Sequence, residues 1–501
     1  MIPGTMPRYL SSLSTGFLCG INLYALVLVL VLLLPAQSLV HAQGSTLPEL
    51  GEAATRYLSP DDEQMIGRRF LRELMATDSY ISDHELRHYL NGLGKRIGSK
   101  ANLGGITPKL NLIRENEINA FAVPGGYITF NSGLMLTTEN ESELASVVGH
   151  EIAHLSQRHL PRMIAQSQAS KIPTTAAILA SILVGGQAGV AGVTLANASL
   201  LSNRLAYSRE FEREADAIGI DLMAKSGYDP RAMSAFFAKL QRFNFVSDKD
   251  VPEYLRTHPL SYTRMAETES RISAYPRVQH ESSLDFHLAR ARVQALYGDP
   301  QTDTQQVLED RITQSQGIQR RAWEYGLALA LMEARRFDEA VALVDEVIRH
   351  LPDTPQVQAA RAEITRQSGN PAAAALAYGE LVEKYPESGY LRYAYLETLL
   401  EAGSAEEAKK SARFQLRRHP EEYELYPLLS RANVALGLLA EAHQADAEFH
   451  AVLGRFGAAL SSLKLALREN NDESQYLTQA IEARIRELER EAADWKLREK
   501  Y

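Results

Sequence analysis

The sequence predicts an α+β domain, mostly helical with a small β-sheet, followed by an all-α solenoid of helical repeats. Helical patterns with one apolar face flank a few short β-prone runs between residues 61 and 280. From about residue 285 the chain becomes rich in Ala and Leu, and three residue types recur there with one common period. The chain has 501 residues, which is too long for one ordinary core and fits two domains plus a targeting segment.

The N-terminus has the layout of a secretory signal peptide, which we assign to residues 1–42. A single basic residue, Arg8, precedes a long uncharged stretch that ends at Pro35, and small residues precede the expected cleavage before Gln43. An uncleaved membrane anchor is the alternative. The one cysteine, Cys19, lies inside this segment, so a cleaved chain has no thiol and must hold any metal with His and carboxylate side chains.

The expected elements of the first domain, residues 61–280, follow a short linker at 43–60. Helices are predicted at 83–97, 141–162 and 210–225, with others starting near 61 and 262, a strand at 110–114, a strand–turn–strand unit at 120–130, and a loop at 256–259. The stretch 172–203 has no charged residue; we favour a helical hairpin or flap over the cleft, with membrane insertion or surface contact as the alternative.

The second domain, residues 285–472, carries an internal repeat of 34 residues, the tetratricopeptide period. The positions that share this period are Ala340, Ala374, Ala408 and Ala442, then Gly369, Gly403 and Gly437, and Pro352, Pro386 and Pro420. Small Ala side chains suit the close approach of paired helices, Gly suits the turn, and Pro ends a helix. The register breaks after Gly437, and a charged C-terminal helix, 473–501, is expected to cap the array.

The chemistry is expected at His150-Glu151-x-x-His154. Residues four apart lie on one face of a helix, so both histidines can bind one metal ion, while Glu151 can exchange protons with a water and a leaving amine. A solvent-facing helix with unrelated histidines is the alternative, but the apolar run 144–149 before the motif favours burial. The net charge of −9 gives no reason to expect nucleic acid as a partner.

A catalytic zinc site needs a third protein ligand. The candidates left open by position alone are His159, Glu210, Glu212, Glu214, Asp216 and His258. Zinc suits two histidines and a carboxylate best, although this set does not exclude other divalent ions.

At this point the sequence resembles the M48 zinc peptidases. The motifs that carry the resemblance are 119–126 (Asn-Ala-Phe-Ala-Val-Pro-Gly-Gly), Gly133-Leu134, His150-Glu151-x-x-His154, 210–216 (Glu-Phe-Glu-Arg-Glu-Ala-Asp), and His258-Pro259 with Arg264. The resemblance spans about residues 60–275. It implies a zincin-like domain with one Zn²⁺ per subunit, Glu214 as the third ligand and Asp216 as a residue that orients a ligand.

The role of His258 has two alternatives. It stabilises the transition state, or it fills the fourth zinc position and holds the enzyme inactive. Residues 119–126 are expected to form either an edge strand to which an extended substrate adds, or a purely structural hairpin.

With its signal and repeats, the whole chain resembles periplasmic members of the family from Gram-negative bacteria. The resemblance implies a periplasmic zinc endopeptidase that acts on misfolded or assembling outer-membrane proteins and also has a chaperone-like role. It further implies that the repeats contact the β-barrel assembly machinery. The alternative is a chaperone or adaptor in which the repeats bind partners and proteolysis is secondary or idle.

Overall fold

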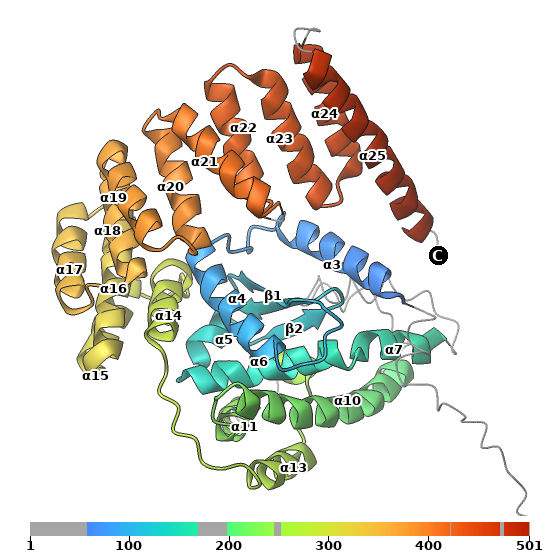
Figure 1. Cartoon of the computed structure of the whole chain (residues 1–501). Helices are drawn as coiled ribbons and strands as arrows, with labels where there is room; N and C mark the ends of the chain where they lie inside the picture. Colours follow the sequence, from blue (N-terminus) through green and yellow to red (C-terminus); the bar gives the residue numbers. More distant parts are fainter. Residues whose placement is uncertain (1–57, 169–197, 245–251, 421, 471–474, 500–501) are drawn as a thin grey trace, which may run out of the picture. The chain divides into compact units, whose positions relative to one another are not determined.

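The computed structural model describes residues 58–168, 198–244, 252–420, 422–470 and 475–499 (Figure 1). The predicted signal peptide, nearly all of the linker and most of the stretch 172–203 lie outside the described residues. Among the helices in the described part of the chain, none combines the length and the apolar character needed to cross a membrane.

The first region folds as helices around a three-stranded sheet. Its strands are β1 (Lys109–Ile113), β2 (Ala120–Val123) and β3 (Tyr127–Asn131), in the order β1-β3-β2. β3 pairs parallel with β1 and antiparallel with β2, so β2 lies at one edge of the sheet. The helices are α3 (Pro60–Leu74), α4 (His84–Gly98), α5 (Ser132–Thr137), α6 (Glu141–Ser156), α7 (His159–Gln168), α10 (Ala198–Lys225), α11 (Arg231–Asn244), α12 (Glu253–Thr257) and α13 (Tyr262–Ile272).

Local sequence explains where several of these elements begin. Ser59 and Asp62 form a reciprocal capping box at the start of α3, and the Asp83 side chain accepts a hydrogen bond from the backbone of Leu86 at the start of α4. The β2–β3 turn places Gly125 and Gly126 at φ values of 88° and 89°, which are open to Gly at little cost. The strand–turn–strand unit predicted at 120–130 is therefore found.

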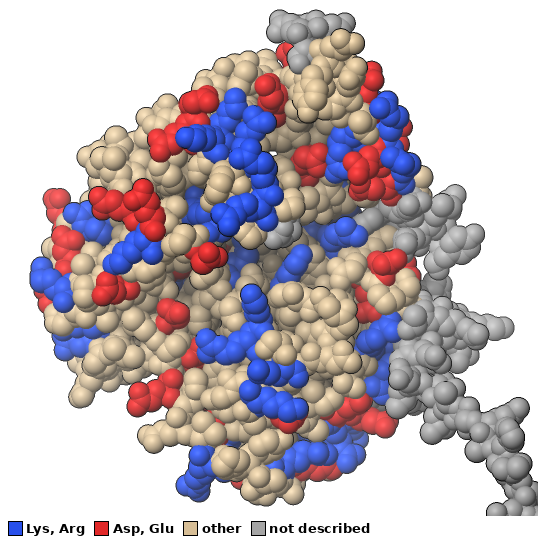
Figure 2. All heavy atoms as spheres, viewed as in Figure 1, with Lys and Arg blue, Asp and Glu red and all other residues tan. Residues whose placement is uncertain are grey.

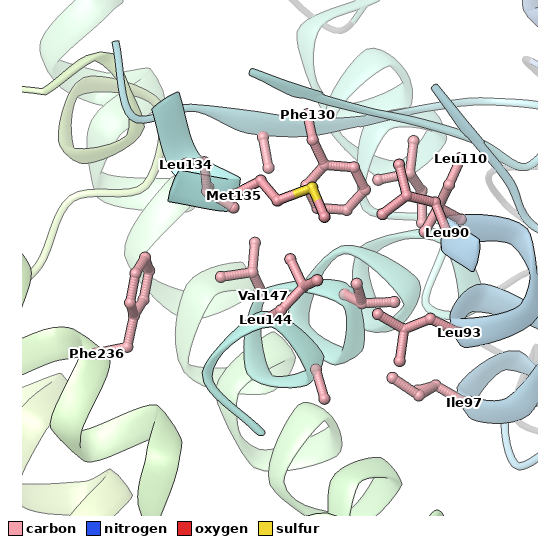
Figure 3. Packing of buried hydrophobic residues seen from close by; sticks show 14 of the residues in the cluster. Leu90, Leu93, Ile97, Leu110, Phe130, Leu134, Met135, Leu144, Val147 and Phe236 are labelled. Carbon is pink, nitrogen blue, oxygen red and sulfur yellow. The ribbon is translucent and has the colours of Figure 1, made fainter. Parts of the chain in front are cut away.

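A buried apolar core fixes α6 against the sheet and against α4. Figure 3 shows Phe130 of β3 directed at the space between the sheet and the helices, opposite Leu144 and Val147 of α6. Leu90 and Leu93 of α4 close the same cluster, and all of these side chains are at most 3% exposed. Burying each such side chain contributes roughly 1.5–3 kcal/mol. The motif helix is thus held rigidly by its apolar face.

The helix predicted at 141–162 is divided in two. α6 ends at Ser156 and α7 begins at His159, because Arg158 takes a left-handed conformation with φ 51°. This conformation costs a non-Gly residue roughly 1–2 kcal/mol. The side chain of Arg158 is held by Glu63 at 2.9 Å and by the carbonyl of Leu58 at 2.7 Å, which offsets that cost. The break turns His159 back toward α6.

The second region is a continuous series of paired helices, as predicted. They are α14 (Leu284–Tyr297), α15 (Thr304–Gln314), α16 (Gly317–Glu333), α17 (Phe337–His350), α18 (Pro355–Gln367), α19 (Pro371–Lys384), α20 (Gly389–Glu401), α21 (Ala405–Arg418), α22 (Leu425–Ala435), α23 (Leu439–Val452), α24 (Phe456–Asn470) and α25 (Gln475–Glu499). The four periodic alanines are at most 2% exposed, and the three periodic glycines all have positive φ. The fold class, an α+β domain followed by an all-α solenoid, is confirmed.

A partly buried ionic cluster links α4 to the first helices of the solenoid. Arg292 of α14 donates to Asp83 at 2.7 Å and to Glu85 at 3.3 Å, and Tyr325 of α16 donates to Glu85 at 2.7 Å. Burial raises the pKa of Glu85 to about 7, although Arg292 opposes that shift. One guanidinium therefore neutralises two acids at this junction only in part.

Candidate metal centre

Two glycines allow the motif helix α6 and helix α10 to cross closely. A Cβ atom added at Gly149 would lie 3.2 Å from the carbonyl oxygen of Gly219, and one added at Gly219 would lie 3.2 Å from the backbone nitrogen of His150. Such separations leave little room for a side chain. The crossing therefore brings the acidic residues of α10 next to the histidines of α6.

Four side chains converge on one point near this crossing: His150, His154, Glu212 and His258. One ligand atom from each lies within 4.8 Å of the others. The Nε2 atoms of His150 and His154 are 2.9 Å apart, and each lies 3.3 Å from a carboxylate oxygen of Glu212. Tetrahedral zinc with bonds of about 2.1 Å separates its ligand atoms by about 3.4 Å, so the donor set and its approximate spacing fit zinc.

The carboxylate in this cluster is that of Glu212, whereas Glu214, which the resemblance implied as the third ligand, lies outside the cluster. Successive helical residues are about 100° apart, so two residues turn the side chain by about 200° and point it away. Glu214 accordingly contacts His159 at 3.1 Å and Arg162 at 3.0 Å. A signal was present in the sequence: Glu212 lies four residues before Asp216 and shares its helix face.

Asp216 and Arg264 support the cluster from behind. An oxygen of Asp216 lies 3.1 Å from Nδ1 of His150, the ring nitrogen that faces away from the other ligands. Arg264 is 1% exposed and donates to both oxygens of Asp216 at 2.7 and 2.8 Å, while it lies 3.0 Å from Glu212. Asp216 therefore lies next to the ring nitrogen of His150 that the orienting role predicted for it would use.

Electrostatics in the cluster favour positive charge between the acids. Burial opposes protonation of His150, but Glu212 and Asp216 outweigh it and raise its pKa to about 10. Burial also opposes ionisation of Glu212, yet His258, His150 and Arg264 hold its pKa well below the usual range. Burial lowers the pKa of His154 to about 4, so this ring is neutral, whereas His150 must give up a proton before it can bind a metal ion.

Glu151 is buried next to the cluster. It is 1% exposed, burial raises its pKa, and neither of its carboxylate oxygens has a hydrogen-bond partner among the described residues. A buried carboxylate without hydrogen bonds is costly unless a ligand or substrate completes it, and the ion-pair partner of this carboxylate is Nε2 of His258 at 3.4 Å. A cavity of about 230 Å³ adjoins it, lined by Phe121 and Ala122 of β2, Leu155 of α6 and Phe211 of α10, among others.

The remaining candidates take different places. His258 follows the short helix α12 where a loop was predicted, and its Nδ1 lies 3.0 Å from Glu212 and 3.3 Å from Nε2 of His150. His159 is buried beside His154 rather than at the surface, and burial lowers its pKa to about 3. Glu210 is exposed and apart from the cluster.

The fold and the cluster define a zinc metallopeptidase with an attached helical-repeat region. A model of Peptidase family M48 matches residues 84–272, and a model of the tetratricopeptide repeat matches residues 314–364. The chain is similar to the "Beta-barrel assembly-enhancing protease" of Escherichia coli (strain K12), with 33% identity over 84% of this chain and 87% of that protein.

Other relatives agree with this classification. A "Putative beta-barrel assembly-enhancing protease" of Vibrio cholerae is 32% identical over 83% of this chain and 86% of that protein. The "Mitochondrial metalloendopeptidase OMA1" of Arabidopsis thaliana is 27% identical over 49% of this chain and 48% of that protein. The chain therefore belongs to the M48 peptidase family and is a metalloendopeptidase.

Proposed function

We propose that His150, His154 and Glu212 hold the zinc and that Glu151 acts as the general base and acid of peptide hydrolysis. The observation that carries this assignment is the convergence of two imidazole nitrogens and one carboxylate oxygen beside the buried carboxylate of Glu151. Zinc, when bound, polarises the scissile carbonyl and lowers the pKa of water. Glu151 then accepts a proton from the attacking water and returns it to the leaving amine.

The substrate is proposed to be an extended polypeptide paired with β2. Among the described strands only β3 pairs with β2, and the β2 residues Phe121 and Ala122 line the cavity next to Glu151. An extended chain can add to an exposed sheet edge through backbone hydrogen bonds, which supplies affinity without demanding a particular sequence. Such a mode suits an endopeptidase that acts on unfolded segments.

His258 is proposed to occupy the fourth ligand position and to hold the site closed at rest. Its Nδ1 belongs to the converging set, and its Nε2 lies 3.4 Å from Glu151, so it fills the space where a reacting water would lie. On this proposal His258→Ala raises basal proteolysis of an unfolded substrate. A loss of cleavage with the zinc content intact would instead assign His258 to transition-state stabilisation.

The relatives named for β-barrel assembly suggest the physiological setting. We propose that the chain is exported to the periplasm by residues 1–42 and degrades misfolded or stalled outer-membrane proteins, with the repeats docking clients or the assembly machinery. On the face drawn in Figure 2, acidic and basic side chains both occur over the peptidase helices and the repeat helices. A protein that docks on this face therefore meets both acidic and basic side chains, and its fit depends on shape as well as on charge.

The decisive experiment is Glu151→Gln in the full mature chain. This variant keeps the metal ligands and removes the base, so it should retain zinc while cleavage of an unfolded outer-membrane protein falls by at least 10²-fold. Outer-membrane assembly is then measured in cells that carry the variant. Full rescue would favour the alternative, a chaperone or adaptor with idle proteolysis; failed rescue with normal zinc content supports the protease.

A further inference from the structure

His154 has a second buried contact on the side opposite the metal cluster. Its Nε2 faces His150 and Glu212, and its Nδ1 lies 2.8 Å from Nδ1 of His159. The other nitrogen of His159, Nε2, lies 3.1 Å from a carboxylate oxygen of Glu214. The three side chains form a continuous row that leads from the cluster toward the surface.

The position of His159 within this row is fixed by its neighbours. Its ring is 4% exposed and stacks on Phe211, with ring centres 4.6 Å apart and an angle of 21° between the planes. Arg162 lies 3.0 Å from Glu214, and its guanidinium lies 4.7 Å from the centre of the Phe211 ring. The left-handed Arg158 turns the chain so that His159 reaches His154. Packing therefore supports the row on both sides.

Hydrogen-bond chemistry determines the direction of each donor in the row. If Nε2 of His154 binds a metal ion, its Nδ1 must carry the proton and donate it. Nδ1 of His159 must then accept, so the proton of His159 lies on Nε2 and is donated to Glu214. Each of the two imidazoles consequently has one compatible tautomer, and the row ends at the carboxylate of Glu214.

The two histidines of the motif are thus supported in different ways. His150 is next to Asp216 directly, whereas His154 reaches Glu214 through the imidazole of His159. Partners of this kind orient a metal-bound imidazole and increase its basicity, and their loss typically lowers metal affinity 10–100-fold. One turn of α10 therefore supplies Glu212 to the inner face and Glu214 to the outer face.

We propose that His159 and Glu214 are positioning residues that orient His154 for zinc binding through a His154–His159–Glu214 hydrogen-bonded row. This inference rests on the proposed function, in which His154 is a zinc ligand. It assigns a role to two residues outside the proposed set of zinc ligands.

The test is the zinc dissociation constant of the full mature chain, measured by competition with a chromophoric chelator. His159→Ala should weaken zinc binding about 10- to 100-fold. His159→Asn should bind zinc nearly as well as the wild type, because its amide oxygen can accept the proton of His154 Nδ1. Glu214→Gln should weaken binding by less than His159→Ala. The matched control is Arg213→Ala, also on α10, whose side chain is 52% exposed; it should leave zinc affinity unchanged.

Thermal unfolding of each chelated variant checks that the chain is folded. Wild-type zinc affinity in folded His159→Ala would overturn the inference, and so would equal losses in His159→Asn and His159→Ala, since packing alone would then explain the effect. A wild-type chain that binds no zinc would refute the proposed function itself, and this outcome is separate from either result with the variants.

Discussion

Arg264 supports the strongest stability prediction, because one buried guanidinium neutralises two acids. Its side chain is 1% exposed and contacts Asp216 at 2.7 and 2.8 Å, Glu212 at 3.0 Å, and the carbonyl of Pro259 at 2.8 Å. The last contact ties the loop after His258 to the acids of α10. Replacing Arg264 with Met keeps much of the side-chain volume and removes every one of these donors.

Removing one partner of a buried ion pair costs about 3–5 kcal/mol, because the other charge is left uncompensated. For a domain of 150–250 residues each kcal/mol lowers Tm by about 2–4 °C. We therefore expect Arg264→Met to lower the transition of the peptidase region by about 6–20 °C. The loss should be larger in chelated protein, because zinc compensates part of the charge of Glu212 when it is bound.

Differential scanning calorimetry measures the loss in Tm twice, once with saturating zinc and once with excess chelator. Arg213→Met is the control, since Arg213 also pairs with a glutamate, Glu267, but lies on the exposed face of α10. Exposed pairs contribute little, so this variant should unfold with the wild type. Equal Tm values for Arg264→Met and Arg213→Met in chelated protein would refute the reasoning.

Two further predictions concern the helix crossing and the junction with the repeats. Gly219→Val places a branched side chain against the backbone of His150. This overpacking should lower the free energy of unfolding by about 1–3 kcal/mol and weaken zinc binding, as measured by competition with a chelator. Unchanged zinc affinity would argue against the tight crossing. Glu85 is half-buried beside Arg292, and its folded pKa of about 7 exceeds its usual value. The stability that protonated Glu85 provides is therefore full below about pH 4.5 and is lost as pH rises through 7. Glu85→Gln should therefore raise Tm more at pH 8 than at pH 5, and a pH-independent change would count against the shifted pKa.

The predictable part of the fold depended on periodic signals. The alanines spaced by 34 residues mark close helix contacts, and the structure buries them. The pair His150 and His154 could be read because residues four apart share a helix face. The parallel pairing of β1 with β3 could not be read, since partners such as Leu110 and Ile128 are brought together by the whole fold and not by a local pattern.

The candidate site was predicted in part for related reasons. The motif located the two histidines and Glu151, but the resemblance led to Glu214, whereas helix geometry with Asp216 as the reference favours Glu212. The place of His159 could not be predicted, because it depends on a left-handed Arg158, a conformation that Arg has no intrinsic preference for. That conformation is set by a distant contact with Glu63.

Zinc stoichiometry of two neighbouring variants, Glu212→Ala and Glu214→Ala, tests the assignment of the metal centre most directly. Each purified chain is dialysed to equilibrium against a buffer whose free zinc is held well above the wild-type dissociation constant, and the bound metal is then measured. Glu212→Ala should lose the bound zinc because it removes a ligand, while Glu214→Ala, at saturating zinc, should still bind one zinc ion per chain, as expected for the wild type. Zinc retained by Glu212→Ala and lost from Glu214→Ala would contradict the proposed centre.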